Sequence, residues 1–512
     1  MPISQLGQLN TTALIVPDLY VQIVPPTVTL LNGVPTNIVG VVGTATWGPV
    51  NSPTLIGTMA DYARQFGAIQ PRKYDAGTAI AAAVLQGAAN FRVVRVTDGT
   101  DTAASATLGT ADITFTSKYT GTLGNSITVT LSAGSAKGST RATVAIPGQM
   151  PEVFDNITGT GNALWVALAN AINLGQSGMR GPSQIVVAGA GLGTETPTLA
   201  TTTLAGGTDG VGTITGSVLI GADTVPRHGM YALRGTGASI AMLTDCDDSA
   251  TWSLQEAYGL SEGTYMIMVG PAGDTIANAA TVKQTAGIDC YAVKLLFGDW
   301  MYFNDTVNAQ VRLISPQGFI AGLLGNLAPQ NSSLNKPLYG IVGTQKSAAN
   351  QVYSTAELQA LIQAGLDVIT NPVPGGFYFG ARCGHNSSSN AVTHGDNYTR
   401  MTNYIAATLN AGMGQFVGKL QTPDVRRQAK ATLDAFLSNL QQQGQIGTAD
   451  GSPCFQVVLD TSNNPQSRVA LGYMQADVKV IYLSVIEYFI VNLEGGQSVQ
   501  ISKQTSTNVS KL

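Results

Sequence analysis

Residues 37–50 carry the sequence NIVGVVGTATWGPV, and the fold is best approached from this stretch. The apolar, β-branched run predicts a buried strand, and the Gly-Pro pair behind it predicts a turn. Residues 58–67 (TMADYARQFG) predict a short helix closed by glycine, and residues 75–89 predict an alanine-rich helix. Residues 91–96 (FRVVRV) predict a second strand, so strands and helices are mixed from the start.

The amino-acid composition of the sequence changes after residue 97. Residues 98–213 are dominated by Thr, Gly, Ala and Ser. Short alternating runs at residues 126–131 and 142–146 predict strands, and residues 163–174 predict one helix. This part is therefore predicted to be a β-rich domain with many turns. In residues 214–395, strands again alternate with helices, which predicts an α/β domain.

The last quarter of the chain again combines helix and strand patterns. Thr422 is a suitable N-cap, and Pro423 suits the first turn of a helix. An apolar stripe at i, i+3, i+4 and i+7 follows, formed by Leu433, Phe436, Leu437 and Leu440. Residues 454–459 and 478–493 predict two further strands. In their combination of helix and strand patterns, residues 396–495 resemble residues 21–97, whereas the middle of the chain does not.

Residues 1–20 and 496–512 are predicted to form extended arms at the two ends of the chain. They are mostly polar and have few apolar residues, apart from short β-branched runs. The run at residues 14–31 contains Pro17, Pro25 and Pro26, and proline is confined to edge strands because it donates no ladder hydrogen bond. We therefore interpret this run as an edge strand or an arm.

Composition excludes several classes of function. Only 11% of the residues are charged, against about 25% in an average protein. A surface of Thr, Ser, Asn, Gln and Gly offers little electrostatic resistance to packing against copies of itself. The net charge is −4, from 26 basic and 30 acidic residues, so there is no basic excess for nucleic-acid binding.

The sequence predicts no membrane insertion and no signal peptide. Residues 1–20 lack a positively charged start followed by an apolar run. The longest apolar stretch, residues 480–493, is interrupted by Glu487 and is shorter than the about 20 residues that span a bilayer. Its Val, Ile, Tyr and Phe content instead predicts a buried strand.

We find no pattern for catalysis, a metal or a cofactor. The cysteines lie far apart and predict free buried thiols; they are Cys246, Cys290, Cys383 and Cys454. His385 and His394 lie near Cys383 and Asp396, but a metal site needs more ligands at regular spacing. We interpret residues 384–396 as a polar surface loop. The protein is accordingly predicted not to be an enzyme.

A series of short stretches runs along residues 37–495. They are VVGTATWGPV (41–50), ADY (60–62) to FG (66–67), GAANFRVVRV (87–96), KYTGTLGN (118–125), LAGGTDG (204–210), SPQGFIAG (315–322), NKPLYGIVG (335–343), Pro423, AFL (435–437), 460–464 and 472–493. In this order the stretches resemble contractile phage tail sheath proteins, and the order carries the resemblance more than any single motif does.

The resemblance implies a fold and an architecture. The expected fold is multidomain α/β and α+β, with a compact α+β core built from both chain ends, residues 21–97 and 396–495. A β-rich domain (98–213) and an α/β domain (214–395) are inserted, and the two arms flank the whole.

The resemblance also implies partners. Copies would stack as hexameric rings in a helical sheath around a tail tube protein, with baseplate and tail terminator proteins at the ends. The sheath would contract from a metastable extended state to drive the tube through the host envelope for genome delivery. Its place would be the virion tail, assembled in the host bacterial cytoplasm.

Two sets of residues are predicted to make these contacts. Strands in the arms would be exchanged between subunits by Leu14, Ile15, Val16, Val21, Ile23, Val24, Val499 and Ile501. The helix after Thr422 would face the tube through Arg426, Arg427 and Lys430. Basic residues near a helix N-terminus are unfavourable because they oppose the helix dipole, and a contact with the tube would explain why they are present. A solvated helix end explains the same three residues equally well.

Two other functions fit the sequence. One is the sheath of a bacteriocin or of a type VI-like secretion system. The other, from a different class, is a phage carbohydrate-binding or glycan-degrading tail protein, which a Thr/Gly-rich β domain with Trp252 and Trp300 would suit. Such an enzyme usually needs a pair of carboxylates in a cleft, and the sequence places none.

Overall fold

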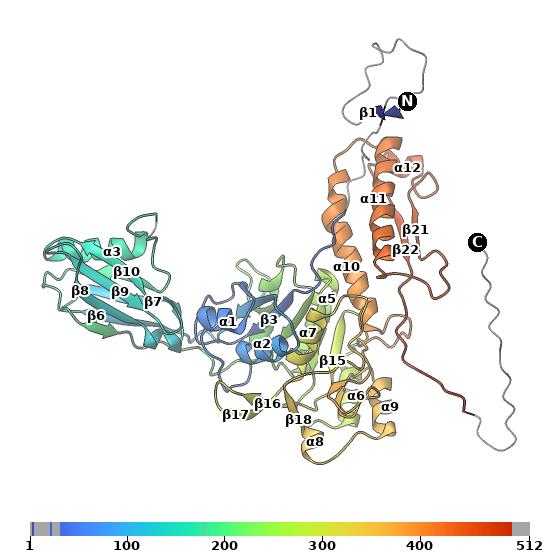
Figure 1. The fold of residues 1–512 in the computed structure, drawn as a ribbon, viewed down its shortest axis with the longest axis horizontal. Helices are drawn as coiled ribbons and strands as arrows, with labels where there is room; N and C mark the ends of the chain where they lie inside the picture. The colour runs from blue at the N-terminus through green and yellow to red at the C-terminus, as the bar shows by residue number, and fades with distance from the viewer. Residues whose placement is uncertain (1–2, 5–20, 23–30, 179, 494–512) are drawn as a thin grey trace, which may run out of the picture.

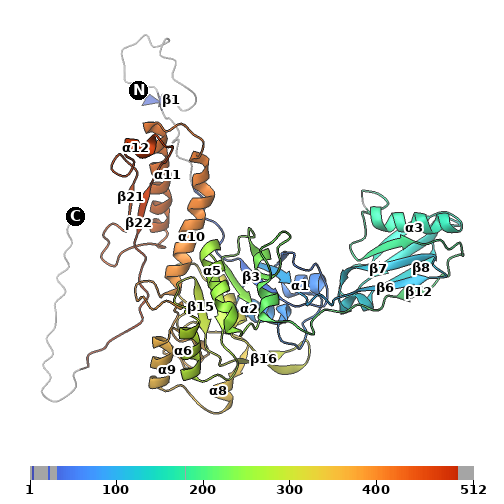
Figure 2. The same cartoon turned by 180° about the vertical axis from the view of Figure 1, so that it is seen from behind.

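The computed structural model describes residues 3–4, 21–22, 31–178 and 180–493. Figure 1 shows three bodies side by side, and Figure 2 shows the same arrangement from behind. We call them the β-rich body (residues 98–213), the central body (31–97 and 214–395) and the C-terminal lobe (396–480). The central body lies between the other two.

A six-stranded sheet forms the middle of the central body. Its order is β15-β14-β13-β3-β5-β4, and all neighbours are parallel except β4 and β5. The sheet therefore joins the first predicted segment to the predicted α/β insertion. Its strands are β3 (Val39–Gly43), β4 (Thr54–Ile56), β5 (Phe91–Arg95), β13 (Ile240–Leu243), β14 (Tyr265–Val269) and β15 (Val293–Leu296).

Helices cover both faces of this sheet, so its central strands are buried throughout. Val41 points to the face covered by α1 (Met59–Phe66), α2 (Ala76–Leu85) and α7 (Gln317–Asn326). Val42 points to the opposite face, which is covered by α4 (Gly216–Ile220), α5 (Trp252–Glu262), α6 (Ile276–Thr285) and α9 (Thr355–Gln363). Parallel strands covered on both faces give continuous apolar runs, which explains the sequence of β3.

Small residues let α2 and α7 approach closely. A Cβ at Gly322 would lie 2.4 Å from Ala83 Cα, and one at Gly318 would lie 2.6 Å from Ala79 O. The alanine-rich composition of α2 therefore serves helix packing against α7. Further elements of the central body are β16 (Met301–Asp305), β17 (Gln310–Ile314), β18 (Ile341–Thr344), α8 (Gln345–Ala348), β19 (Ile369–Thr370) and β20 (Gly380–Ala381).

The β-rich body has an antiparallel core of its own. Its sheets have the orders β10-β9-β8-β12 and β11-β7-β6, and α3 (Asn162–Leu174) packs with them. The strands are β6 (Ala103–Leu108), β7 (Ile113–Thr120), β8 (Thr128–Ala133), β9 (Thr140–Ala145), β10 (Glu152–Ile157), β11 (Val186–Ala190) and β12 (Thr201–Thr203). The strands and the helix predicted at residues 126–131, 142–146 and 163–174 are confirmed.

Polar side chains join the β-rich body to the central body. The buried guanidinium of Arg95 donates to the carbonyls of Gly48 and Thr120 at 2.8 and 2.7 Å. Arg72 pairs with Asp209 at 2.6 Å, and Asp209 accepts from the backbone N–H of Thr122 at 2.7 Å. These bonds give each of the buried charges at the connection between the two bodies at least one polar partner.

The C-terminal lobe packs two helices against a short hairpin. These are α10 (Asp396–Met413), α11 (Pro423–Gln442), β21 (Phe455–Val458) and β22 (Asp477–Val480), with α12 (Gln466–Val469) between the strands. Helix α11 confirms its prediction: Thr422 is the N-cap, Pro423 is in the first turn, and the stripe from Leu433 to Leu440 is buried. Leu31 packs into this core, but β3 and β5 do not.

Two expectations need correction. The grouping of residues 21–97 with 396–495 does not match the strand pairing, because β3 is hydrogen-bonded to β5 and β13 of the central sheet. The strand expected at residues 478–493 ends at Val480, because β21, its partner, reaches only from Phe455 to Val458. Residues 481–493 have no strand pairing within the described part of the chain.

Two further findings concern the cysteines and the helices. All four cysteines are free and buried, as predicted. Among the helices of the described residues, none is both long and apolar enough to span a bilayer.

Candidate functional surfaces

The residues of both arms that are predicted for strand exchange are only partly described. Val21 lies in β2 (Val21–Gln22), which pairs in parallel with β1 (Ile3–Ser4) of the same chain, with Ile3 opposite Val21. The other seven fall outside the described residues: Leu14, Ile15, Val16, Ile23, Val24, Val499 and Ile501. Strand exchange between subunits therefore stays a prediction.

Residues 481–493 form an exposed apolar segment, which we call the C-terminal segment. Its first part is held to the lobe: the backbone N–H of Ile481 donates to Cys454 O at 2.7 Å, and Asn397 donates to Leu483 O at 3.1 Å. Beyond that part, the side chains of Tyr488, Phe489 and Ile490 are more than 80% exposed. Single soluble chains rarely expose contiguous apolar side chains in this way, so the segment is a candidate interaction surface.

The basic residues predicted to face the tube lie at the start of α11, and acids partly neutralise them. Arg427 pairs with Asp424, and Lys430 pairs with Asp434 at 2.7 Å. Arg427 is exposed, while Arg426 and Lys430 are partly buried. The structure thus places the three side chains on one end of one helix, with a smaller positive field than the sequence alone indicates.

An apolar hollow lies beside this end of α11. It has a volume of about 780 Å³ and is lined mainly by apolar side chains from the end of α10, the loop to α11, and the segment before β22. Val417 and Leu420 in that loop are more than 80% exposed. The basic residues therefore border an apolar surface, a combination that suits a protein partner.

A buried ionic cluster fixes the start of α10 to the central sheet. Lys294 of β15 is fully buried, 2.6 Å from Asp367 and 3.1 Å from Asp396, the first residue of α10. Asp396 also accepts from Tyr265 at 2.6 Å and from Ser333. Burial opposes the charged form of Lys294, yet the two carboxylates outweigh it and raise its pKa. Burial likewise opposes the charged form of Asp396, but Lys294 and the hydroxyl donors lower its pKa.

A second buried cation ties α10 to the end of α7. Arg400 donates to the carbonyls of Leu327 and Ala328 at 2.7 and 3.1 Å. These carbonyls lie at the C-terminus of α7, where the helix dipole favours a cation. Burial lowers the pKa of Arg400 to about 10. Sequence reasoning missed both clusters, although a lysine inside the apolar run YAVKLLF (291–297) was a usable signal.

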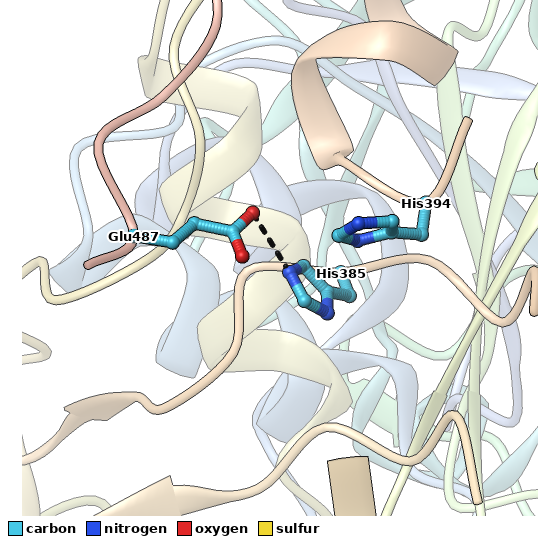
Figure 3. A group of neighbouring side chains, drawn as sticks. All are labelled: His385, His394 and Glu487. Atoms are coloured by element: carbon cyan, nitrogen blue, oxygen red, sulfur yellow. Dashed lines mark hydrogen bonds and ion pairs between the residues drawn. The ribbon is translucent and has the colours of Figure 1, made fainter. Parts of the chain in front are cut away.

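Three side chains from separate parts of the sequence meet at the C-terminal segment. His385, His394 and Glu487 bring one ligand atom each within 4.8 Å of one another (Figure 3). The sequence predicted a polar surface loop and no metal site here, because the histidines have too few further ligands at regular spacing. Glu487 lies far along the chain and was not part of that prediction. Asp396 and Cys383, their neighbours in sequence, belong instead to the buried Lys294 cluster and to the core.

The two tryptophans of the carbohydrate alternative are both buried. Trp252 is 2% exposed and Trp300 is 6% exposed. Trp300 also donates its indole N–H to Gly270 O at 3.0 Å. Neither ring is available to stack against a sugar.

Comparisons with known proteins agree with the architecture. No protein-family model and no curated protein matches the sequence. A sheath tail protein of Desulfitobacterium hafniense matches with a TM-score of 0.58 at 17% identity, over 86% of this chain and 93% of that one. One of Listeria innocua matches with a TM-score of 0.60 at 16% identity, over 84% and 90%. The helical sheath of the anti-feeding prophage, in its contracted state, matches with 0.54 at 13% identity, over 94% and 100%.

The chain is a mixed α/β protein with several separate sheets. Its fold is that of contractile tail sheath proteins. The resemblance inferred from the sequence is thereby confirmed as a likeness of fold.

Proposed function

We propose that the chain is a structural subunit of a contractile tail sheath and has no enzymatic activity. Copies stack as hexameric rings around a tail tube, between baseplate and terminator proteins. Contraction from a metastable extended state drives the tube through a host envelope and delivers a genome. The subunit is assembled in the bacterial cytoplasm and resides in the virion tail.

The single observation that carries the proposal is the fold, which matches sheath proteins over most of both chains. The exposed C-terminal segment supports it independently. An extended apolar segment beside a short hairpin suits addition of a strand to a sheet of another copy. Four or five backbone hydrogen bonds between the added strand and the sheet, at about 1 kcal/mol each, would stabilise each link by several kcal/mol.

The arms have the reach that such links need. A segment of about 20 extended residues spans at most roughly 65–70 Å, enough to reach a neighbouring subunit. Links of this kind keep rings connected while the bodies slide and rotate. The interface between subunits then has two arrangements, one in the extended sheath and one in the contracted sheath. Contacts at the baseplate shift the balance between them.

A second candidate is the sheath of a contractile injection particle without a genome. The matches include the anti-feeding prophage sheath and an extracellular contractile injection system named PVC, the latter with a TM-score of 0.54 at 12% identity. Nucleic acid inside purified particles favours the phage tail, and its absence favours the injection system.

Electron microscopy of the expressed protein tests the proposal. We expect hollow tubes for the full chain and dispersed monomers after deletion of residues 1–20 or 496–512. Dispersed full-length particles that degrade glycans would favour the carbohydrate alternative. Normal tubes from both truncated chains would refute strand exchange by the arms, and contraction that requires ATP would refute stored conformational energy.

A further inference from the structure

The loop at residues 385–395 holds two histidines side by side. His385 and Gly395 form an antiparallel bridge, and the backbone N–H of Asn386 donates to His394 O at 2.7 Å. The side chain of Asn386 also donates to Thr393 O at 2.7 Å. The two imidazole rings therefore lie with centroids 3.9 Å apart and planes at 74° (Figure 3).

The backbone of this loop is anchored to the central body. Lys294 donates to His385 O at 2.9 Å, and Lys283 donates to Ser387 O at 3.1 Å. The N–H of Ser389 donates to Asp289 at 2.7 Å. Outer contacts of this kind orient side chains that bind a ligand before the ligand arrives.

Glu487 reaches the same place from the C-terminal segment. Its carboxylate lies 3.0 Å from His385 Nε2, and the three side chains line an open hollow of about 390 Å³. A tetrahedral zinc ion bound at about 2.0–2.2 Å would set its ligand atoms about 3.3–3.6 Å apart. The three ligand atoms lie within 4.8 Å of one another, so the ion would draw them closer together.

One ring nitrogen of His394 has no partner. Its Nδ1 is buried and has no hydrogen-bond partner within the described part of the chain. A buried polar atom without a partner calls for an explanation, and a bound ion supplies one. Lys283 also lines the hollow, but its ammonium is turned to Ser387 O.

We infer that His385, His394 and Glu487 bind one divalent cation of the zinc class, with the fourth position open to water. Two imidazoles and a carboxylate match the ligand preference of zinc, whereas magnesium and calcium prefer oxygen ligands. The ion would fix the C-terminal segment to the loop at residues 385–395. It would thus fix the position of Glu487 relative to the central body. This inference rests on the geometry of one subunit and does not depend on sheath assembly.

Zinc titration of the full-length chain tests the site. The chelator-treated protein is titrated with Zn²⁺ by calorimetry, and with Co²⁺ for its visible absorption. We expect one ion per chain and at least tenfold weaker binding in His394→Ala and in Glu487→Gln. The matched control is His228→Ala, which removes the third, exposed histidine and leaves affinity unchanged. Wild-type binding no tighter than that of His394→Ala, or full affinity in Glu487→Gln, would overturn the inference.

A second measurement separates metal binding from general damage. Zinc should slow protease cleavage within residues 481–493 of the wild-type chain, and not of Glu487→Gln. Thermal unfolding without zinc verifies that each variant folds, and His385→Gln replaces His394→Ala if that variant does not. Equal cleavage of the wild-type segment with and without zinc would refute the fixing of the C-terminal segment.

Discussion

Lys294 Nζ lies 2.6 Å from Asp367 Oδ2, and both side chains are almost completely buried. The lysine belongs to β15, the aspartate precedes β19, and Asp396 adds the first turn of α10 to the same cluster. One ammonium thus connects the central sheet to the helix that carries the C-terminal lobe. Charges can be buried in this way because each has an opposite charge and hydrogen-bond donors or acceptors around it.

Removing the ammonium should destabilise this connection. In Lys294→Met, Asp367 and Asp396 stay buried without a cation, which we expect to lower the free energy of unfolding by about 3–5 kcal/mol. Denaturant unfolding measures the loss, and faster hydrogen exchange in the first turns of α10 locates it. The control Lys479→Met changes an exposed lysine and should have little effect. Equal stability of the two variants would contradict the structural role of the cluster.

Asp75 should make stability depend on pH. It caps α2 by accepting from the N–H of Thr78 at 2.8 Å, and burial raises its pKa to about 6. Because the unfolded value is about 3.9, the folded chain binds the proton more tightly than the unfolded chain does. Asp75 is therefore most favourable below pH 4, and its contribution is lost as pH rises through about 6.

Asp75→Asn tests this sign, because the amide stays neutral and keeps an oxygen to accept from Thr78. Relative to wild type, the free energy of unfolding of the variant should rise from about pH 4 to pH 7, by up to about 3 kcal/mol. Unfolding curves across this range measure the difference. Asp450→Asn is the contrast: hydrogen bonds from Ser452 lower the pKa of that exposed carboxyl, so no gain is expected near neutrality. A flat difference for Asp75→Asn would show that folding does not raise the pKa of the carboxyl.

Charge reversal on α11 should weaken association with the tube. Arg427 is the most exposed of the three basic residues, so Arg427→Glu should have the largest effect, followed by Arg426→Glu and Lys430→Glu. The loss should shrink as salt rises, since salt screens exposed charges. Cosedimentation with tubes at two salt concentrations measures it. Lys137→Glu, an exposed lysine of the β-rich body, is the matched control. Identical cosedimentation of Arg427→Glu and this control would remove α11 as the tube contact.

The C-terminal segment should matter for assembly and not for folding. Phe489 and Ile490 are 85% and 81% exposed, so Phe489→Ser with Ile490→Ser should change subunit stability by less than about 0.5 kcal/mol. Tube formation should nevertheless fall strongly, because the apolar contact with another copy is lost. Electron microscopy and sedimentation measure assembly. The control Leu192→Ser alters a side chain that is 94% exposed in the β-rich body. Tubes from the double variant equal to those of this control would argue against the segment as an interface.

Some features were predictable because the residues that determine them are close in sequence. Helix α11 follows from a cap, a proline and a stripe within one short stretch, and β3 from one apolar run. The error at residues 478–493 has the opposite cause. A β-branched apolar pattern indicates a strand, but a strand forms only where a partner supplies hydrogen bonds, and β21 ends after four residues.

Patterns within the sequence were enough to predict most of the local elements, the distinct composition of residues 98–213, the free thiols and the likeness to sheath proteins. Three-dimensional packing was needed to show that β3 pairs with β13, some 200 residues away, that Lys294 meets Asp367 and Asp396, and that Glu487 reaches His385. The difference lies in the range of the interactions. Caps and periodicity act between residues within a few positions of each other, whereas strand pairing and buried charge pairs depend on how the whole chain packs.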